Sequence, residues 1–160
     1  MNKKDGGILT LIIHNDRTYS DPMITRLRRE PSLFVKIFTD VTSAMHYMKR
    51  KGVKVDILIL DGRISCGKDF PKEGTQNEMI TGMVLYDQIR RQNREFRIIL
   101  FTTMFEVCNN FAWSDPNLTM LMAQASTLEY QVIKSLERIF PGDFEKKVIV
   151  SRKSKKVSTT

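Results

Sequence analysis

The segment that decides the fold is Lys54-Val55-Asp56-Ile57-Leu58-Ile59-Leu60-Asp61-Gly62. Its apolar residues run unbroken from Ile57 to Leu60, and an acid and a glycine end the run. A short continuous run of this kind is typical of a strand that is buried on both faces of a parallel sheet. Ligands and reacting groups lie beyond the carboxyl ends of such strands. Asp61 is therefore expected to be a metal ligand or a phosphoryl acceptor, or else to cap a turn with Gly62.

Similar apolar runs elsewhere, separated by helix-like segments, predict an alternating α/β chain. Strands are expected at residues 8–13, 33–38, 57–60, 97–102 and 118–122. Helices are expected at about 21–30, 41–51, 80–92, 104–114 and 127–139, with weak periodicity in the fourth. Strands that alternate with helices pair in parallel through right-handed crossovers. The prediction is a single doubly wound α/β domain, in which a five-stranded parallel sheet is flanked by about five helices.

Local signals mark where several of these elements begin and end. Asp21 can cap the first helix, with Pro22 at its first helical position, and Thr127 can cap the last helix. A proline and a glycine at 141–142 end that last helix. Residues 62–78 contain three glycines and show no clear periodicity. They are expected to form a long loop, which is either functional or a tolerated surface insertion.

The composition indicates a globular protein with a basic C-terminal segment. Of the 160 residues, 41% are apolar, and no run approaches the roughly 18 apolar residues of a membrane span. The N-terminus lacks the apolar core of a signal peptide, so a cytoplasmic protein without a membrane partner is expected. The net charge is +8, and residues 141–160 hold six bases and two acids, which account for +4. We therefore expect a domain at 1–140 and a basic tail at 141–160.

The residues that could carry other chemistries are few. Cys66 and Cys108 lie far apart in the sequence and lack metal-site spacing, so reduced thiols are expected, with Cys66 at the surface. His14 and His46 are the only histidines, which leaves few ways to form a zinc site or a hydrolase triad. The sequence has neither a phosphate-binding glycine loop nor a dinucleotide fingerprint. These classes of enzyme are not predicted.

Three segments, taken in order, resemble response-regulator receiver domains, and the resemblance covers about residues 8–140. Val-Asp-Ile-Leu-Ile-Leu-Asp at 55–61 resembles the third strand of that family. Thr-Gly-Met-Val-Leu-Tyr-Asp-Gln-Ile-Arg at 81–90 is similar to the third helix, and Ile-Ile-Leu-Phe-Thr-Thr at 98–103 is similar to the fourth strand. The resemblance implies a flavodoxin-like fold with strand order 2-1-3-4-5.

The resemblance also implies a mechanism. Asp61 would be the phosphoryl acceptor, and Thr102 would be the switch hydroxyl that moves to bond the acyl phosphate. A divalent cation, Mg²⁺, would neutralise the charge that develops during transfer. Its ligands would be Asn15, Asp16, Asp61 and the backbone carbonyl of Arg63.

Two of the four site elements depart from the family pattern. The family has two acids after the first strand, where this chain has His14 and Asn15, with Asp16 one place later. Histidine is a poor ligand for Mg²⁺, and asparagine is a neutral one. The family's lysine after the fifth strand is replaced by Gln124, which can bond a phosphoryl oxygen but carries no charge. Lys68, or a protonated His14, could supply part of the missing charge.

The sequence therefore predicts an atypical single-domain receiver of a two-component phosphorelay, phosphorylated on Asp61. Its partners would be a histidine kinase or phosphotransfer protein and a downstream protein that binds a surface around residues 103–130. The chain would be a monomer or weak homodimer, with self-phosphorylation and dephosphorylation as its only enzymatic steps.

Two alternatives remain open. One is a phosphorylation-independent pseudo-receiver adaptor, which the altered acids and Gln124 favour. The other is a nucleic-acid-associated accessory protein that acts through the basic tail at 141–160. Sequence-specific DNA binding is not expected, because no recognition module follows the receiver-like segment.

Overall fold

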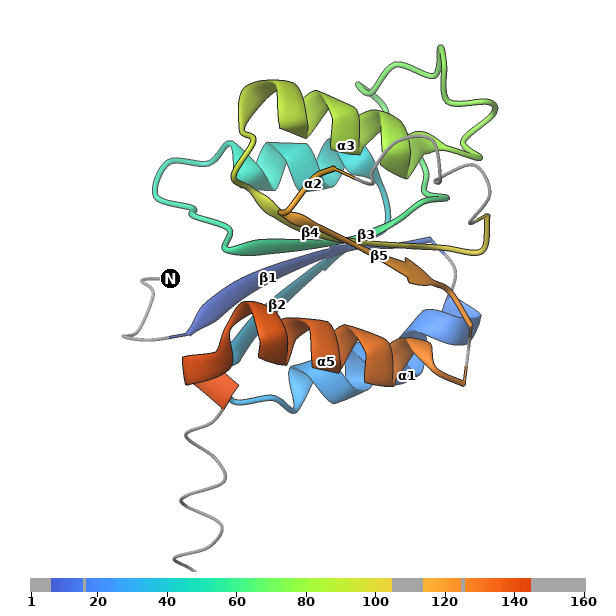
Figure 1. Cartoon of the computed structure of the whole chain (residues 1–160). Helices are drawn as coiled ribbons and strands as arrows, with labels where there is room; N and C mark the ends of the chain where they lie inside the picture. Colours follow the sequence, from blue (N-terminus) through green and yellow to red (C-terminus); the bar gives the residue numbers. More distant parts are fainter. Residues whose placement is uncertain (1–6, 16, 105–113, 125, 145–160) are drawn as a thin grey trace, which may run out of the picture.

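The computed structural model describes residues 7–15, 17–104, 114–124 and 126–144. Within them, five strands form one parallel sheet in the order β2-β1-β3-β4-β5 (Figure 1). The strands are β1 (Ile8–Ile13), β2 (Leu33–Phe38), β3 (Ile57–Asp61), β4 (Arg97–Thr102) and β5 (Leu118–Met122). The helices of these residues are α1 (Arg17–Arg28), α2 (Val41–Met48), α3 (Thr81–Gln92) and α5 (Leu128–Ile139). The predicted α/β class, strand positions and strand order are confirmed.

The sheet separates two apolar cores. Helices α2 and α3 cover one face of it, and α1 and α5 cover the other (Figure 1). Side chains alternate along β3, so that Leu58 and Leu60 join the core under α2 and α3. Ile57 and Ile59 join the core under α1 and α5. The unbroken apolar run predicted a strand buried on both faces, and β3 is buried along its whole length.

The register brings the strand ends to one side of the sheet, which we call the carboxyl edge. Ile13 of β1 lies opposite Leu60 of β3, and Asp61 lies opposite Phe101 of β4. The last residue of β4, Thr102, is opposite Met122 of β5. The predicted functional positions therefore follow neighbouring strands at one edge.

The start of the first helix differs from the prediction. Helix α1 begins at Arg17, and Pro22 lies inside it instead of at its first position. The turn before the proline is held by tertiary packing, because Ser20 is fully buried and its hydroxyl is 2.9 Å from Nδ1 of His14. Asp21 is exposed within the helix and does not cap it. Packing here outweighs the local signal.

The cap of the last helix also differs. Thr127 precedes α5, but its φ of −124° and ψ of −18° are not those of an extended cap, and its hydroxyl makes no capping bond. The backbone oxygen of Gln124 takes that role and accepts bonds from the N–H groups of Thr127 and Leu128 at 3.0 and 2.9 Å. Helix α5 ends at Ile139, as the proline and glycine that follow predicted.

The helix expected at 104–114 and most of the basic tail lie outside the described residues. Among the residues that the structure describes, no helix has the length and hydrophobicity to cross a membrane.

Candidate functional site

Asp61 and Thr102 end neighbouring strands and are both buried. Asp61 is 1% exposed and Thr102 is 2% exposed. Oδ1 of Asp61 accepts a hydrogen bond of 2.9 Å from the backbone N–H of Arg63. The hydroxyl of Thr102 accepts one of 3.0 Å from the backbone N–H of Met104. An acid and a hydroxyl are thus held in turns at the carboxyl edge, where the resemblance implied them.

Two glycines allow the chain to pack tightly around this pair. A Cβ on Gly62 would lie 2.8 Å from Oγ1 of Thr102, and one on Gly82 would lie 2.1 Å from the backbone oxygen of Asp61. The N–H of Gly82 donates to the carbonyl of Gly62 at 3.0 Å. The first turn of α3 is therefore fixed directly against the end of β3.

The exit of β1 provides an imidazole where the family pattern has a carboxylate. His14 is 3% exposed, and its Nδ1 is 2.9 Å from the Ser20 hydroxyl of α1. It follows Ile13, whose register partner Leu60 precedes Asp61, so His14 and Asp61 end adjacent strands. Asn15 is exposed at the same edge, and Asp16 lies outside the described residues.

The oxygen donors at this edge suit a hard cation, although together they carry little negative charge. Asp61, Asn15 and the carbonyl of Arg63 offer only oxygen atoms, the donors that Mg²⁺ prefers. Asp61 supplies the carboxylate among these three. Nowhere in the described part of the chain do three or more His, Cys, Asp or Glu side chains gather as a metal cluster.

The remaining predicted site residues are exposed. The Gln124 side chain is exposed, whereas its backbone carbonyl accepts the N–H groups of Thr127 and Leu128 at the start of α5. Arg63 and Lys68 are exposed in the segment after β3. The structure brings together Asp61, Thr102 and the β1 exit. Within the described parts of the chain, the side chains of Gln124 and Lys68 are directed to solvent and form no hydrogen bond with these residues.

The segment after β3 is packed against α2. Its residues Ile64, Cys66, Phe70 and Ile80 join the core under α2 and α3. The prediction of a surface cysteine was wrong, because Cys66 is fully buried. Apolar residues scattered through the segment carry no period, which explains why the sequence did not indicate its packing.

Thr42 of α2 organises the first half of this segment. Its hydroxyl donates to the carbonyl of Cys66 at 3.0 Å and accepts from the N–H groups of Asp69 and Phe70 at 2.9 and 3.2 Å. The backbone of Ser65 also forms an isolated parallel bridge with Asp40. A buried threonine in an apolar helix stripe gave no sign of this role.

Glu78 fixes the second half of the segment after β3. Its Oε1 accepts bonds from the Cys66 N–H at 2.9 Å and the Ser65 hydroxyl at 3.2 Å. The bond from the backbone of Cys66 lowers the pKa of Glu78 and, with the Ser65 bond, outweighs the effect of desolvation. Gln76, Asn77 and Glu78 all have positive φ, between 50° and 69°. Such backbone is strained for side-chain-bearing residues, and the Glu78 bonds help to hold it.

A buried ion pair fixes the far end of α3. Arg90 bonds the carboxylate of Asp115, which also accepts from the Tyr86 hydroxyl at 2.8 Å. Burial would raise the pKa of Asp115, but the bonds from Arg90, Tyr86 and the Asn117 N–H outweigh it and hold that pKa below its ordinary value. Arg90 is therefore not an ordinary solvated base, because its side chain is only 12% exposed. The dipeptide Asp-Pro at 115–116 is typical of a turn and does not indicate this ion pair.

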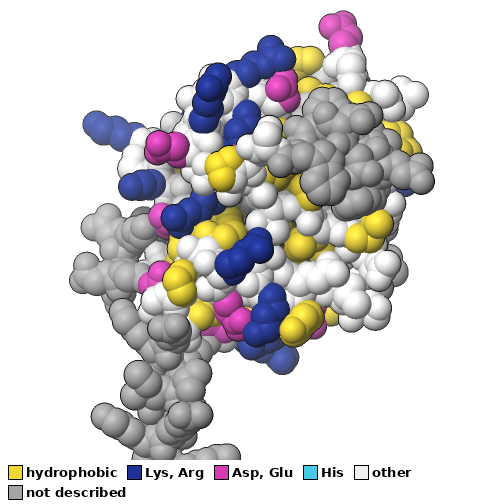
Figure 2. Space-filling view, in the orientation of Figure 1, with side chains coloured by type: hydrophobic (Ala, Val, Ile, Leu, Met, Phe, Trp, Pro, Cys, Tyr) yellow, Lys and Arg dark blue, Asp and Glu magenta, His cyan; other side chains and the backbone are white. Residues whose placement is uncertain are grey.

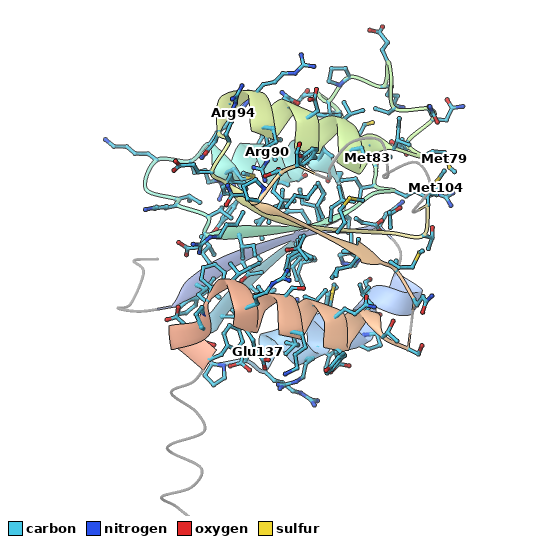
Figure 3. The ribbon with its side chains drawn as sticks, in the orientation of Figure 1. Met79, Met83, Arg90, Arg94, Met104 and Glu137 are labelled. Carbon is cyan, nitrogen blue, oxygen red and sulfur yellow. The ribbon has the colours of Figure 1, made fainter. Side chains whose placement is uncertain are left out.

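The two ends of α3 therefore differ in character. Figure 3 shows Met79, Met83 and Met104 at the carboxyl edge, while Arg90 and Arg94 lie at the opposite end of the helix. Met83 is buried, and Met79 and Met104 are partly exposed. Methionines thus lie at the end of α3 near Asp61 and Thr102, and arginines lie at its other end.

Comparisons with solved structures identify the fold. No family model matches the sequence, and no curated protein matches it. The chain is similar to the RcsB response regulator of Salmonella typhimurium, with a TM-score of 0.58 and 15% identity over 86% of this chain. It spans 61% of the length of that protein.

Two other similar structures are covered by this chain over almost their whole length. The receiver domain of a Francisella response regulator gives a TM-score of 0.54 at 13% identity, with 83% of this chain and 99% of that one covered. TrrA of Thermotoga maritima, solved with Mg²⁺ and beryllofluoride, gives a TM-score of 0.52 at 16% identity. The match covers 79% of this chain and 97% of that one. At these identities the likeness concerns the backbone arrangement, and it agrees with the strand order found here. The chain has the fold of response-regulator receiver domains.

Proposed function

We propose that the chain is a receiver-type signalling domain in which Asp61 accepts a phosphoryl group and Thr102 responds to it. The observation that supports this proposal is the pair of buried side chains at the ends of β3 and β4. The pair follows two of the most completely buried strands, at the edge of a parallel sheet where such folds bind their ligands.

The chain's own groups have distinct parts in this proposal. A carboxylate oxygen of Asp61 attacks the phosphorus of the donor's phosphohistidine, and the P–N bond breaks as the new P–O bond forms, which releases the donor's imidazole. The Arg63 N–H, which bonds Oδ1, orients the carboxylate. The Thr102 hydroxyl exchanges its bond with the Met104 N–H for one that it donates to a phosphoryl oxygen. Because Met104 begins the segment after β4, this exchange alters the surface that a downstream protein would bind. Asp61 is 1% exposed, so the residues that cover it must move before a phosphodonor reaches it.

The fold implies a metal ion at this site. Asp61, Asn15 and the Arg63 carbonyl, together with Asp16, would hold Mg²⁺, which would neutralise the charge on the transferring group. The phosphodonor would be a histidine kinase or phosphotransfer protein. The domain would occupy residues 1–140, with the basic tail at 141–160 outside the signalling step.

A second function, a phosphorylation-independent adaptor, is favoured by one observation. His14 is buried and bound to Ser20 at the place of a family acid, and the uncharged Gln124 stands at the lysine position. Phosphoryl transfer with so little compensating charge is slow. In that case the pair of Asp61 and Thr102 would serve only to hold β3, β4 and α3 together.

Intact-mass measurement after incubation with acetyl phosphate and Mg²⁺ distinguishes the two. The first proposal expects one phosphoryl adduct on the wild-type chain and none on Asp61→Asn. Gln124→Lys should form the adduct faster, because a positive charge then faces the phosphoryl oxygens. If the wild-type chain forms no adduct while Asn15→Asp/Gln124→Lys does, the altered positions disable the site, and the adaptor function holds.

A further inference from the structure

A groove opens at the side of the sheet where the strands begin, opposite Asp61; we call it the amino-edge groove. Its volume is about 560 Å³, and it lies between the ends of α2 and α3 and the residues that lead into β3 and β4. Phe140, after α5, forms its far side. The groove therefore joins three helices and two central strands, and its role is independent of the function proposed for Asp61.

The floor of the groove is apolar and only partly covered. Met45, Met48, Val55 and Phe96 line it, and each is a partly buried side chain that packs on the core under α2 and α3. Ile89 of α3, which is 8% exposed, completes it. Unbranched methionine side chains adapt their shape to an incoming group. An apolar side chain that enters the groove would remove this surface from water.

The rim of the groove is basic. Residues 49–54 contain four bases, Lys49, Arg50, Lys51 and Lys54, and no acid. All four are exposed. Arg97, which is also exposed, lines the groove from the β4 side, as Lys49 and Lys54 do from the α2 side. In Figure 2, Lys and Arg side chains, with Asp and Glu side chains between them, lie beside hydrophobic side chains on the left of the visible face.

Two acids, Asp56 and Glu95, also line the groove, and Asp87 and Asp115 lie on the nearby α3 side. The carboxylate of Asp56 accepts the backbone N–H of Leu9 at 2.8 Å, which ties it to the sheet. Asp115 is bonded to Arg90, and Asp87 pairs with Arg91 at 2.6 Å. Glu95 is the remaining acid among the described residues that line the groove. Among the described residues, three bases and two acids therefore line the groove, and the exposed Arg50 and Lys51 beside it add to the excess of positive charge.

Arg97 on the rim lies over an aromatic ring, and so does Arg50, which lies outside the groove lining but in the adjoining basic segment. The guanidinium of Arg97 lies 4.8 Å from the centroid of the Phe140 ring, and that of Arg50 lies 5.6 Å from the Tyr47 ring. Stacking of this kind limits the orientations of a guanidinium and leaves its N–H donors directed outward. Binding an anion there would require less loss of side-chain freedom.

We propose that the amino-edge groove binds an acidic segment of a partner protein that carries an apolar anchor residue. The anchor would fill the floor between Met48 and Phe96, and flanking Asp or Glu side chains would pair with Lys54 and Arg97. A protein segment suits the groove better than a nucleic acid does. The Phe140 ring already carries Arg97, and the rest of the floor is mainly aliphatic, so it offers little surface on which bases could stack.

The test is selection from a randomised peptide display library on the full-length protein, followed by NMR mapping with the synthetic form of the most enriched peptide. We expect enriched peptides to combine Asp or Glu with an aromatic or large aliphatic residue. The backbone amide shifts should be confined to residues 45–56 and 88–97. Replacing the apolar residue of the peptide with alanine, or its acids with amides, should each weaken binding at least tenfold.

Charge-reversal variants make the test specific. Lys54→Glu and Arg97→Glu should each weaken binding about fivefold to tenfold. Lys68→Glu makes the same change of net charge on an exposed residue at the other edge, and it should leave binding within about twofold. The proposal is overturned if no acidic-apolar peptide is enriched, if the shifts lie elsewhere, or if Lys68→Glu weakens binding equally. Tighter binding of single-stranded DNA than of the peptide at the same residues would also overturn it.

Discussion

A side chain on Gly82 would lie 2.1 Å from the backbone oxygen of Asp61, so the first turn of α3 rests directly on the end of β3. The Gly82 N–H also bonds the Gly62 carbonyl at 3.0 Å. A helix this close transmits any change in the turn at residues 61–63 to its whole length. The relation explains why a glycine stands in a helix where alanine would otherwise be favoured.

Gly82→Ala tests this close approach. The new methyl group meets backbone atoms, which cannot rotate away, so either α3 or the β3 turn must shift. We expect a loss of about 1–3 kcal/mol in the free energy of unfolding, measured by urea denaturation. Gly142→Ala is the matched control, because a Cβ there meets no atom within 4 Å. Its unfolding free energy should stay within about 0.5 kcal/mol of wild type. Equal values for the two variants would contradict the close approach.

The ion pair of Arg90 and Asp115 should contribute far more to stability than an exposed pair on the same helix. Arg90→Ala leaves the Asp115 carboxylate, 13% exposed, without its main partner, and should reduce the unfolding free energy by about 3 kcal/mol. Arg91→Ala breaks the ion pair with Asp87, whose side chains are 78% and 47% exposed for arginine and aspartate. This variant should change the unfolding free energy by less than about 0.5 kcal/mol. Thermal unfolding of both variants gives the comparison. Similar melting temperatures would show that the Arg90 pair is not structural.

Acidic pH should destabilise the packing of the segment after β3, because it protonates the Glu78 carboxylate. Its pKa is lowered by the Cys66 N–H bond, so the folded state favours the carboxylate. The stabilisation is complete above the ordinary value of 4.5 and is lost as the pH falls through the lower folded-state pKa. Glu78→Gln should therefore be less stable than wild type at neutral pH, and the difference should shrink below pH 4.5. Glu73→Gln, at an exposed position of the same segment, is the control. A difference that grows with acid would contradict the assignment.

The thiol of Cys66 should be protected in the native protein. It is fully buried, and its nearest polar neighbour is the Thr81 hydroxyl at 3.6 Å. In a Cys108→Ser background, an aromatic disulfide reagent should label it only as the segment opens, and the rate should rise with urea before global unfolding. Thr42→Val removes the hydroxyl that organises the segment and should speed labelling at least tenfold. Immediate labelling of the parent protein would show that the segment is open.

The sequence was sufficient for the fold because the strands carry strong local signals. The unbroken run of β3 and the similar run of β4 correspond to strands buried on both faces, and the intervening helices have clear apolar stripes. The start of α1 could not be predicted, since it depends on the bond between Ser20 and His14 across two elements. The absence of a capping bond from Thr127 could not be predicted either, because the conformation of this residue is set by the turn that leads from β5.

The candidate site was only partly predictable. Asp61 and Thr102 follow apolar strands, so their positions could be derived from the strand ends. The sequence did not indicate the roles of Thr42, Glu78 and Asp115. Each of these residues acts through backbone groups or through a partner far away in the sequence. Whether Gln124 and Asn15 participate in chemistry stays a prediction that the mass measurement addresses.

The most direct test of the central claim is the NMR response of Thr102 and Met104 to beryllofluoride with Mg²⁺, a mimic of the phosphorylated aspartate. The account predicts that the amide signals of both residues shift, because the Thr102 hydroxyl gives up the Met104 N–H for the new group on Asp61. Asp61→Asn should abolish the shifts, and Thr102→Val should abolish that of Met104 alone. A wild-type spectrum unchanged by beryllofluoride would contradict the claim and leave the chain as a phosphorylation-independent adaptor.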